Sequence, residues 1–198
     1  MIDLNLPGIS DDEFIRDKVP MTKEEIRILT MCKARIRPDS IVWDIGAGTG
    51  SLSIEAALLA PQGHVYAVEK KDLAVQLLHR NLEKFNLSDR IDVVAGEAPE
   101  ALKELPPCDA VLIGGSGKNM DDILDFIDTR LAPGGRIVAN AVTVQTIAEL
   151  TKYMTAKENY TYEAVQVQVN RLRKVGSYDM FNAFNPVYIV TCVKGDKK

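Results

Sequence analysis

The feature of this sequence that most constrains its fold is a glycine-rich loop directly after a short apolar segment. Residues 41–45 predict a buried strand, and Gly46, Gly48 and Gly50 follow at intervals of two residues. Glycines remove side chains where a backbone must turn sharply or where a ligand lies against it. The next segment, 51–60, predicts a helix whose first amides would face such a ligand. The chain therefore predicts a strand, a ligand-binding loop and a helix in succession.

Short apolar segments alternate with helical ones along most of the remaining chain. The further strands are expected over 64–69, 91–95, 110–113 and 136–141, and the further helices over 72–85, 99–104, 120–131 and 144–157. This alternation indicates a parallel sheet covered on both faces. Residues 160–170 alternate apolar and polar side chains, and 187–193 supply a final strand with no helix between them. We therefore expect a Rossmann-like α/β fold, with a mostly parallel seven-stranded sheet, helices on both faces and a C-terminal antiparallel hairpin.

The first twenty residues predict an irregular arm that ends at Pro20. Thr22 and Glu25 have the spacing of a capping box, which predicts a helix N-cap at Thr22 and a helix running to about Arg35. No linker rich in Pro, Gly or Ser divides the 198 residues. We therefore expect one domain over 1–198, with 1–20 as its N-terminal arm.

Composition restricts the partners and the compartment. A formal net charge of −4 disfavours a broad contact with nucleic acid. No apolar stretch approaches the roughly 20 residues that span a bilayer, and the N-terminus does not resemble a signal peptide. Cys32, Cys108 and Cys192 lie far apart, which disfavours a disulfide framework or a zinc site. We expect a cytoplasmic protein with three buried cysteines and no membrane or nucleic-acid partner.

The glycine loop also carries a family resemblance. With Asp44 before it, the pattern D-x-G-x-G-T-G resembles motif I of class I S-adenosylmethionine-dependent methyltransferases, in which the acidic residue orients the loop and the amino group of the cofactor. Glu69 ends the second strand about 20 residues later, where a carboxylate can accept hydrogen bonds from both ribose hydroxyls. The resemblance places Glu97 and Ala98 beside the adenine. A ligand-free turn and a solvated acid remain the alternatives for the loop and for Glu69.

A second resemblance is more specific and covers nearly the whole chain. The matching segments are Asp11-Asp12-Glu13-Phe14-Ile15, Val19-Pro20, Thr22-x-x-Glu25-x-Arg27, Gly96-x-Ala98-Pro99-Glu100-Ala101, Ile113-Gly114-Gly115-Ser116-Gly117 and Asn185-Pro186-Val187. They resemble the decarboxylating carbon-15 methyltransferases of cobalamin biosynthesis, which act on cobalt-precorrin-6B. The resemblance implies methylation of carbon 15, loss of carbon dioxide from the acetate on carbon 12, and a homotetramer. The residues expected to contact S-adenosylmethionine are Thr22, Asp44, Gly46, Ala47, Gly48, Thr49, Gly50, Glu69, Glu97 and Ala98.

The tetrapyrrole substrate would carry many carboxylates. Two candidates for binding it, Gly115 and Ser116, lie in the turn expected after the fourth strand. Two more, Arg171 and Arg173, lie in the densest basic cluster, and guanidinium groups bind carboxylates bidentately. A solvated strand edge would account for the two arginines equally well. A conjugated macrocycle can present an electron-rich carbon, so alignment and water exclusion are expected to carry catalysis. We therefore predict no nucleophilic side chain and no protein-bound metal, and assign no catalytic residue.

Two other interpretations remain open. A tRNA adenosine methyltransferase has a similar sheet and helix start, although it would need a larger basic surface and usually an extra N-terminal domain. A protein that binds the cofactor without turnover would keep the same glycines and acidic residues. Some relatives carry the carbon-5 methyltransferase in the same polypeptide, and we expect this chain to act as a separate subunit.

Overall fold

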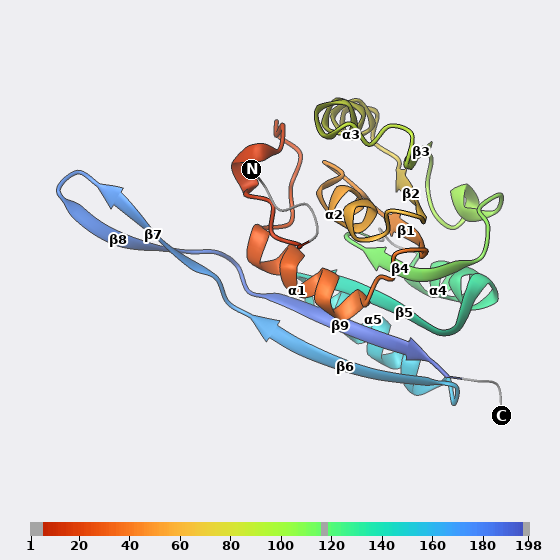
Figure 1. Ribbon diagram of the computed structural model, residues 1–198. Helices are drawn as coiled ribbons and strands as arrows, with labels where there is room; N and C mark the ends of the chain where they lie inside the picture. Colours follow the sequence, from red (N-terminus) through yellow and green to blue (C-terminus); the bar gives the residue numbers. More distant parts are fainter. Residues whose placement is uncertain (1–5, 116–118, 196–198) are drawn as a thin grey trace.

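The computed structural model describes residues 6–115 and 119–195, which form a seven-stranded sheet with helices on both faces and a projecting two-stranded arm (Figure 1). The sheet order is β3-β2-β1-β4-β5-β9-β6, in which β1 to β5 are parallel and β9 runs antiparallel to both β5 and β6. Its strands are β1 Ile41–Ile45, β2 His64–Glu69, β3 Ile91–Ala95, β4 Cys108–Ile113, β5 Leu131–Ala141, β6 Tyr160–Val167 and β9 Val187–Lys194. The predicted fold class is confirmed.

The helices divide between the two faces of the sheet. They are α1 Glu24–Ala34, α2 Ser51–Leu59, α3 Asp72–Phe85, α4 Met120–Arg130 and α5 Val144–Thr155. Successive side chains of a strand point to opposite faces. Val42 accordingly packs in the core beneath α1, α2 and α3, whereas Trp43 packs in the core against α4 and α5. Among the described residues, no helix is both long and apolar enough to cross a membrane.

The order of the strands creates a crevice at one end of the sheet. β1 lies between β2 and β4 and pairs with both of them in parallel. The chain leaves β1 toward β2 and β3 and then returns to β4 on the other side of β1. In such sheets the connections at this point diverge, and ligands bind outside the carboxyl ends of the strands.

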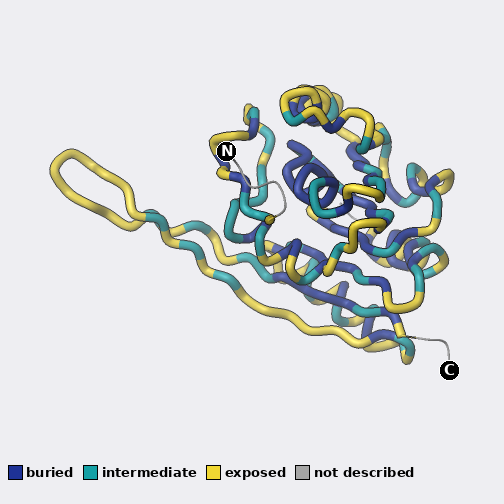
Figure 2. The backbone as a smooth tube through the Cα atoms, in the orientation of Figure 1, coloured by how far each residue is buried: buried dark blue, intermediate teal, exposed yellow. Residues whose placement is uncertain are grey.

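The arm consists of β7 Asn170–Val175 and β8 Tyr178–Ala183, paired only with each other among the described residues. It extends well beyond the sheet, and its surface is almost entirely exposed (Figure 2). The arm carries several large apolar side chains that are exposed, namely Leu172, Val175, Tyr178, Met180 and Phe181. A two-stranded ribbon of this kind is marginally stable alone in water.

The N-terminal segment packs against α1 and α3 and contains a 3₁₀-helix, η1, over Asp11–Glu13. The ring of Phe14 lies 5.1 Å from that of Phe85, measured between centroids. The backbone amide of Ile15 donates to Oδ1 of Asn81 at 2.7 Å. The segment is therefore fixed to the body by both apolar and polar contacts.

The start of α1 differs from the prediction. The N-cap residue is Lys23 and its side chain makes no cap hydrogen bond, so the predicted N-cap at Thr22 is wrong. Oδ1 of Asp11 accepts a hydrogen bond from the amide of Glu24 at 3.0 Å instead. A carboxylate contributed from the preceding segment thus satisfies a free amide at the positive end of the helix dipole.

Other boundaries also differ from the predictions. The helix expected over 99–104 is only the 3₁₀-helix η2, Glu100–Leu102, since the prolines at 106 and 107 leave little room to continue it. β5 begins five residues earlier than the predicted Arg136, with an irregular pairing between Cys108 and Ala110. The single strand expected over 160–170 ends at Val167, and the unassigned segment after it forms the arm.

One expected burial is also wrong. Cys108 and Cys192 are buried, but Cys32 is exposed because it lies on the outer side of α1, next to the buried Met31. A single turn of helix carries side chains to both the core and the solvent.

Candidate functional site

A pocket of about 620 Å³ lies at the carboxyl ends of β1, β2, β3 and β4. It is lined by residues from the loops after these strands and from the N-terminal segment: Lys18, Val19, Pro20, Ile45, Gly46, Gly48, Val68, Glu69, Lys70, Lys71, Leu73, Ala74, Gly96, Glu97, Ala98, Gly114 and Gly115. Pockets for small ligands typically occupy about 300–1,000 Å³. The pocket therefore lies where the strand order predicts a ligand, and it has a suitable size.

The glycine loop, which forms one side of the pocket with Gly46 and Gly48, has glycine at three left-handed positions. Gly46, Gly48 and Gly50 have φ of 75°, 57° and 78°. A Cβ on Gly46 would lie 2.4 Å from the backbone oxygen of Gly115, and one on Gly50 would lie 2.1 Å from Cδ1 of Leu78. The loop thus needs glycine both for its backbone angles and for its close approach to neighbouring elements.

Glu69 is held in a fixed orientation at the end of β2. Its Oε2 accepts a hydrogen bond from the amide of Gly48 at 2.9 Å. Its Oε1 accepts from the amides of Lys70 and Lys71, each at 2.9 Å. A carboxylate has about four lone-pair sites, so Glu69 keeps acceptor capacity toward the pocket while its backbone contacts fix its position.

Asp44 lies beneath the glycine loop and is fully buried. Its Oδ2 accepts a hydrogen bond from Oγ of Ser53, while its Oδ1 has no hydrogen-bond partner among the described residues. Burial, with a smaller contribution from the charge of Glu69, raises the pKa of Asp44 to about 6. A buried carboxylate with a free oxygen favours a nearby cation or donor.

Ala98 and Glu97 form the far corner of the pocket, after β3. Ala98 is buried, whereas Glu97 is exposed and its Oε1 accepts a hydrogen bond from Nζ of Lys70 at 2.6 Å. This corner offers an apolar surface with a polar edge, an arrangement that suits an aromatic base.

The N-terminal segment supplies a wall of the pocket that sequence reasoning did not assign. Lys18, Val19 and Pro20 line the pocket, and a Cβ on Gly48 would lie 3.4 Å from the backbone oxygen of Pro20. The dipeptide Val19-Pro20 favours an extended backbone and was a usable signal for an ordered wall. Its position over the glycine loop depends on tertiary contacts alone.

Five of the ten residues predicted to contact the cofactor do not line the pocket. They are the buried Asp44 and, in addition, Thr22, Ala47, Thr49 and Gly50. The backbone oxygen of Thr49 accepts a hydrogen bond from Nδ2 of Asn81 at 2.9 Å, and that of Thr22 accepts one from Nη1 of Arg27 at 2.5 Å. The backbones of Thr22 and Thr49 thus join the segments beside the pocket to α1 and α3.

The predicted substrate-binding residues lie in two separate places. Gly115 borders the pocket, while Ser116 lies outside the described residues. Arg171 and Arg173 lie in β7, away from the pocket. Arg173 is exposed, whereas Arg171 donates to carboxylates of Asp11 and Glu25. The structure therefore brings Gly115 to the glycine loop and separates both arginines from it.

The residues of the pocket fit S-adenosylmethionine. The glycine loop leaves room for a ligand, Glu69 presents an oriented acceptor, and Ala98 forms an apolar corner. Asp44 lies outside the pocket lining, and its buried carboxylate, with one oxygen that has no partner among the described residues, places negative charge near a positively charged ligand.

Comparison with known proteins identifies the family of the chain. The family described as precorrin methyltransferase domain matches residues 12–194. The chain belongs to the precorrin methyltransferase family. A probable cobalt-precorrin-6B C(15)-methyltransferase (decarboxylating) from Pyrobaculum calidifontis is 41% identical over 187 residues, which cover 93% of this chain and 95% of that protein. The cobalt-precorrin-6B C(15)-methyltransferase (decarboxylating) of Salmonella typhimurium is 35% identical, covering 94% of this chain and 96% of that protein.

A solved structure agrees with this family. The precorrin-6y C5,15-methyltransferase from Geobacter metallireducens GS-15 has a TM-score of 0.89 and 41% identity, covering 94% of this chain and 98% of that chain. The predicted family is therefore confirmed, and the pocket lies within the matched residues.

Proposed function

We propose that this chain transfers a methyl group from S-adenosylmethionine to carbon 15 of cobalt-precorrin-6B and promotes decarboxylation of the acetate on carbon 12. The observation that carries the proposal is the pocket at the carboxyl ends of β1 and β2, in which an oriented Glu69 faces the glycine loop in a chain of the precorrin methyltransferase family. The name shared by the curated relatives supplies the substrate.

The residues of the pocket divide the work of holding the cofactor. Glu69 accepts hydrogen bonds from the ribose hydroxyls, the backbone from Gly46 to Gly50 lies along the methionine part, and Ala98 with Glu97 borders the adenine. Asp44 provides negative charge beneath the loop. S-adenosylmethionine supplies an electrophilic methyl group on a sulfonium. The protein contributes position and exclusion of water rather than an attacking side chain.

The substrate approaches from the open side of the pocket, past Gly114 and Gly115. Arg173 is exposed on β7 and can pair with a carboxylate of the macrocycle. Arg171 could do so only by exchanging one of its present carboxylate partners. We therefore rank Arg173 first among the arginines, as a residue that binds the periphery of the ring.

The activity is tested by mass spectrometry of an anaerobic incubation with S-adenosylmethionine and cobalt-precorrin-6B. The expected product gains one methyl group and loses one carbon dioxide. An unchanged tetrapyrrole, with cofactor binding still detected by calorimetry, would contradict the substrate and leave a methyltransferase fold with another acceptor. A parallel incubation with tRNA is expected to give no methylated nucleoside.

We further propose that the protein is a cytoplasmic homotetramer joined through the arm. The arm exposes apolar side chains, and its strands pair only with each other within the part of the chain that the structure describes. Both features favour burial against another copy of the chain. The scattered cysteines suit a reducing compartment. Light scattering of the purified chain is expected to give a mass about four times that of the monomer.

A further inference from the structure

A buried arginine binds both ends of one stretch of the N-terminal segment. Arg27 is fully buried in α1. Its Nη1 donates to Oδ1 of Asp11 at 2.7 Å and to the backbone oxygen of Thr22 at 2.5 Å, and its Nη2 donates to the backbone oxygen of Ile9. Its Nε donates to Oε1 of Glu55 at 2.9 Å. Separating these groups would leave buried charges without partners, which is costly. Their mutual contacts therefore hold the segment in one arrangement.

The part of the chain between these contacts lies over the cofactor pocket. Residues 15–22, here called the strap, contain three of the residues that line the pocket. The strap begins where Ile15 binds Asn81, whose Nδ2 also binds the oxygen of Thr49 in the glycine loop. It ends where Thr22 binds Arg27. The position of the strap therefore depends on its two anchored ends.

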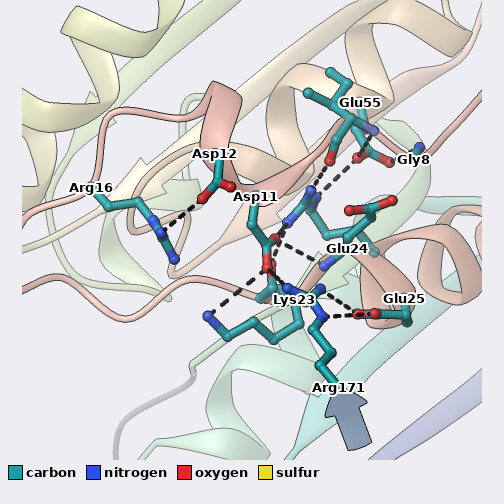
Figure 3. A network of polar contacts seen from close by, with 12 residues as sticks. Gly8, Asp11, Asp12, Arg16, Lys23, Glu24, Glu25, Glu55 and Arg171 are labelled. Atoms are coloured by element: carbon teal, nitrogen blue, oxygen red, sulfur yellow. Dashed lines mark hydrogen bonds and ion pairs between the residues drawn. The ribbon is translucent and has the colours of Figure 1, made fainter. Parts of the chain in front are cut away.

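The base of the arm is bound to the same anchor. Arg171, the second residue of β7, donates from Nη1 to Oδ2 of Asp11 at 2.9 Å. It also donates from Nε and Nη2 to the two carboxylate oxygens of Glu25, at 2.8 and 2.6 Å, in a bidentate pair. Figure 3 shows Arg171 reaching from its strand toward these carboxylates. Asp11 thus has one oxygen on Arg27 and the other on Arg171.

The pKa values of the two carboxylates agree with these contacts. Burial alone would raise the pKa of Asp11, but Arg27 and Arg171 outweigh it and hold the pKa below its usual value. The bidentate contact with Arg171 likewise lowers the pKa of Glu25. Both carboxylates therefore remain ionised and paired at neutral pH.

We propose that Arg171 is a positioning residue for cofactor binding, which couples the arm to the strap through Asp11. The inference rests on the proposed function of the pocket and deepens it. When Arg171 holds Asp11, the segment that leads into the strap is fixed, and so is Arg27, which holds the end of the strap at Thr22. The pocket wall is then formed before the cofactor arrives. Without Arg171, Asp11 keeps Arg27, the amide of Glu24 and the more distant Lys23 but loses the partner of its Oδ2 at 2.9 Å, so the strap samples positions that bind the cofactor less well.

This role can be separated from the role of Arg171 as a binder of substrate carboxylates. A substrate-binding arginine changes the affinity for the tetrapyrrole and leaves cofactor affinity in its absence unchanged. A positioning arginine changes cofactor affinity with no tetrapyrrole present. Calorimetry with S-adenosylmethionine alone is therefore the deciding measurement.

The test compares Arg171→Gln with Lys174→Gln in the 198-residue chain. Lys174 lies on the same strand and pairs with Asp179 within the arm, so its replacement removes one positive charge without touching the strap. We expect Arg171→Gln to weaken binding of S-adenosylmethionine about 3- to 10-fold and Lys174→Gln to stay within about twofold of wild type. Hydrogen exchange of residues 15–22 is expected to accelerate in Arg171→Gln alone.

Two further variants keep the inference open to refutation. Arg171→Lys retains the charge but not the bidentate geometry, so it is expected to weaken binding less than Arg171→Gln and serves if the latter does not fold. Glu25→Gln is expected to weaken binding too, and the double variant Glu25→Gln with Arg171→Gln to be no worse than Arg171→Gln, because Glu25 acts through Arg171.

Several results would overturn the inference. Wild-type cofactor affinity in folded Arg171→Gln would exclude the positioning role while leaving the proposed function intact. Equal losses in Arg171→Gln and Lys174→Gln would indicate a general effect of charge. A wild-type chain that binds no S-adenosylmethionine would refute both this inference and the proposed function.

Discussion

The body of the molecule and the arm are built from the same kind of backbone pairing but differ in what surrounds it. In β1, Val42 and Trp43 are wholly inaccessible to solvent, and helices cover both faces of the strand. In the arm, β7 and β8 pair with each other while most of their side chains remain exposed (Figure 2). Hydrogen bonding alone therefore does not distinguish the two regions. The difference is the apolar area that each region buries.

The contrast indicates where a change in sequence will act. A substitution in the body removes contacts that the isolated chain makes with itself, so it changes the free energy of unfolding. A substitution in the arm removes few such contacts and acts on what the arm binds. Matched pairs of substitutions, one in each region, test this distinction.

The largest effect is expected for a buried charge of the body. Arg27→Met leaves the buried Glu55 without its cation and takes from Asp11 its buried partner, so that Asp11 keeps the half-buried Arg171. Removing one partner of such a buried group costs about 3–5 kcal/mol. Arg173→Met, on the exposed arm, is expected to change the free energy of unfolding by less than about 0.5 kcal/mol. Urea denaturation followed by circular dichroism measures both, and similar values for the two variants would remove the distinction between body and arm.

The next effect concerns the buried carboxylate Asp44. Its pKa in the folded state is about 6, above the usual value of 3.8, so the folded state binds more protons than the unfolded state between those pH values. The contribution of Asp44 to stability therefore falls as pH rises through this window, by about 3 kcal/mol in total.

Asp44→Asn is accordingly expected to become more stable relative to wild type as pH rises from 4 to 7, and to bind S-adenosylmethionine less tightly. The matched variant Asp179→Asn, in the exposed arm, removes no buried carboxylate. Denaturation at several pH values checks the pair. A difference between wild type and Asp44→Asn that does not vary with pH would contradict the expectation.

Two glycines with positive φ give a smaller and more specific effect. Gly46→Ala places a Cβ against the backbone of Gly115, whereas Gly176→Ala, at the turn of the arm, meets nothing within 4 Å. We expect Gly46→Ala to cost about 1–3 kcal/mol and to reduce cofactor affinity at least about tenfold. Gly176→Ala carries only the strain of its φ of 62°, about 1 kcal/mol. Calorimetry should find its cofactor affinity unchanged, and a loss there would connect the arm tip to the pocket.

The smallest effect on the unfolding of the chain is expected at the surface of the arm. Phe181→Ser is expected to change monomer stability by less than about 0.5 kcal/mol but to dissociate the proposed tetramer. Val144→Ser replaces an equally exposed apolar residue in the body and is the control. Light scattering measures the mass of each variant. A tetramer that persists in Phe181→Ser, or is lost in Val144→Ser, would move the interface away from this part of the arm.

The sequence by itself determined the parallel α/β architecture and the place of the pocket at the ends of its strands. Buried strands of a parallel sheet appear as short apolar runs, and the residues that end them meet at one edge of the sheet. Gly46, Gly48 and Glu69 could therefore be assigned to one site from their spacing. These features depend on local pattern, which a linear sequence records directly.

Only the tertiary structure decided which polar side chains meet across the fold. The pairing of Arg27 with Asp11 and Glu55, and of Arg171 with Asp11 and Glu25, joins residues up to 160 positions apart. The arm could not be predicted from the sequence either. Its strands are exposed on both faces, so their residues do not alternate between apolar and polar as those of a half-buried strand do. The same arginine can bind a substrate or hold a strap in place, and the difference lies in the neighbours that folding brings to it.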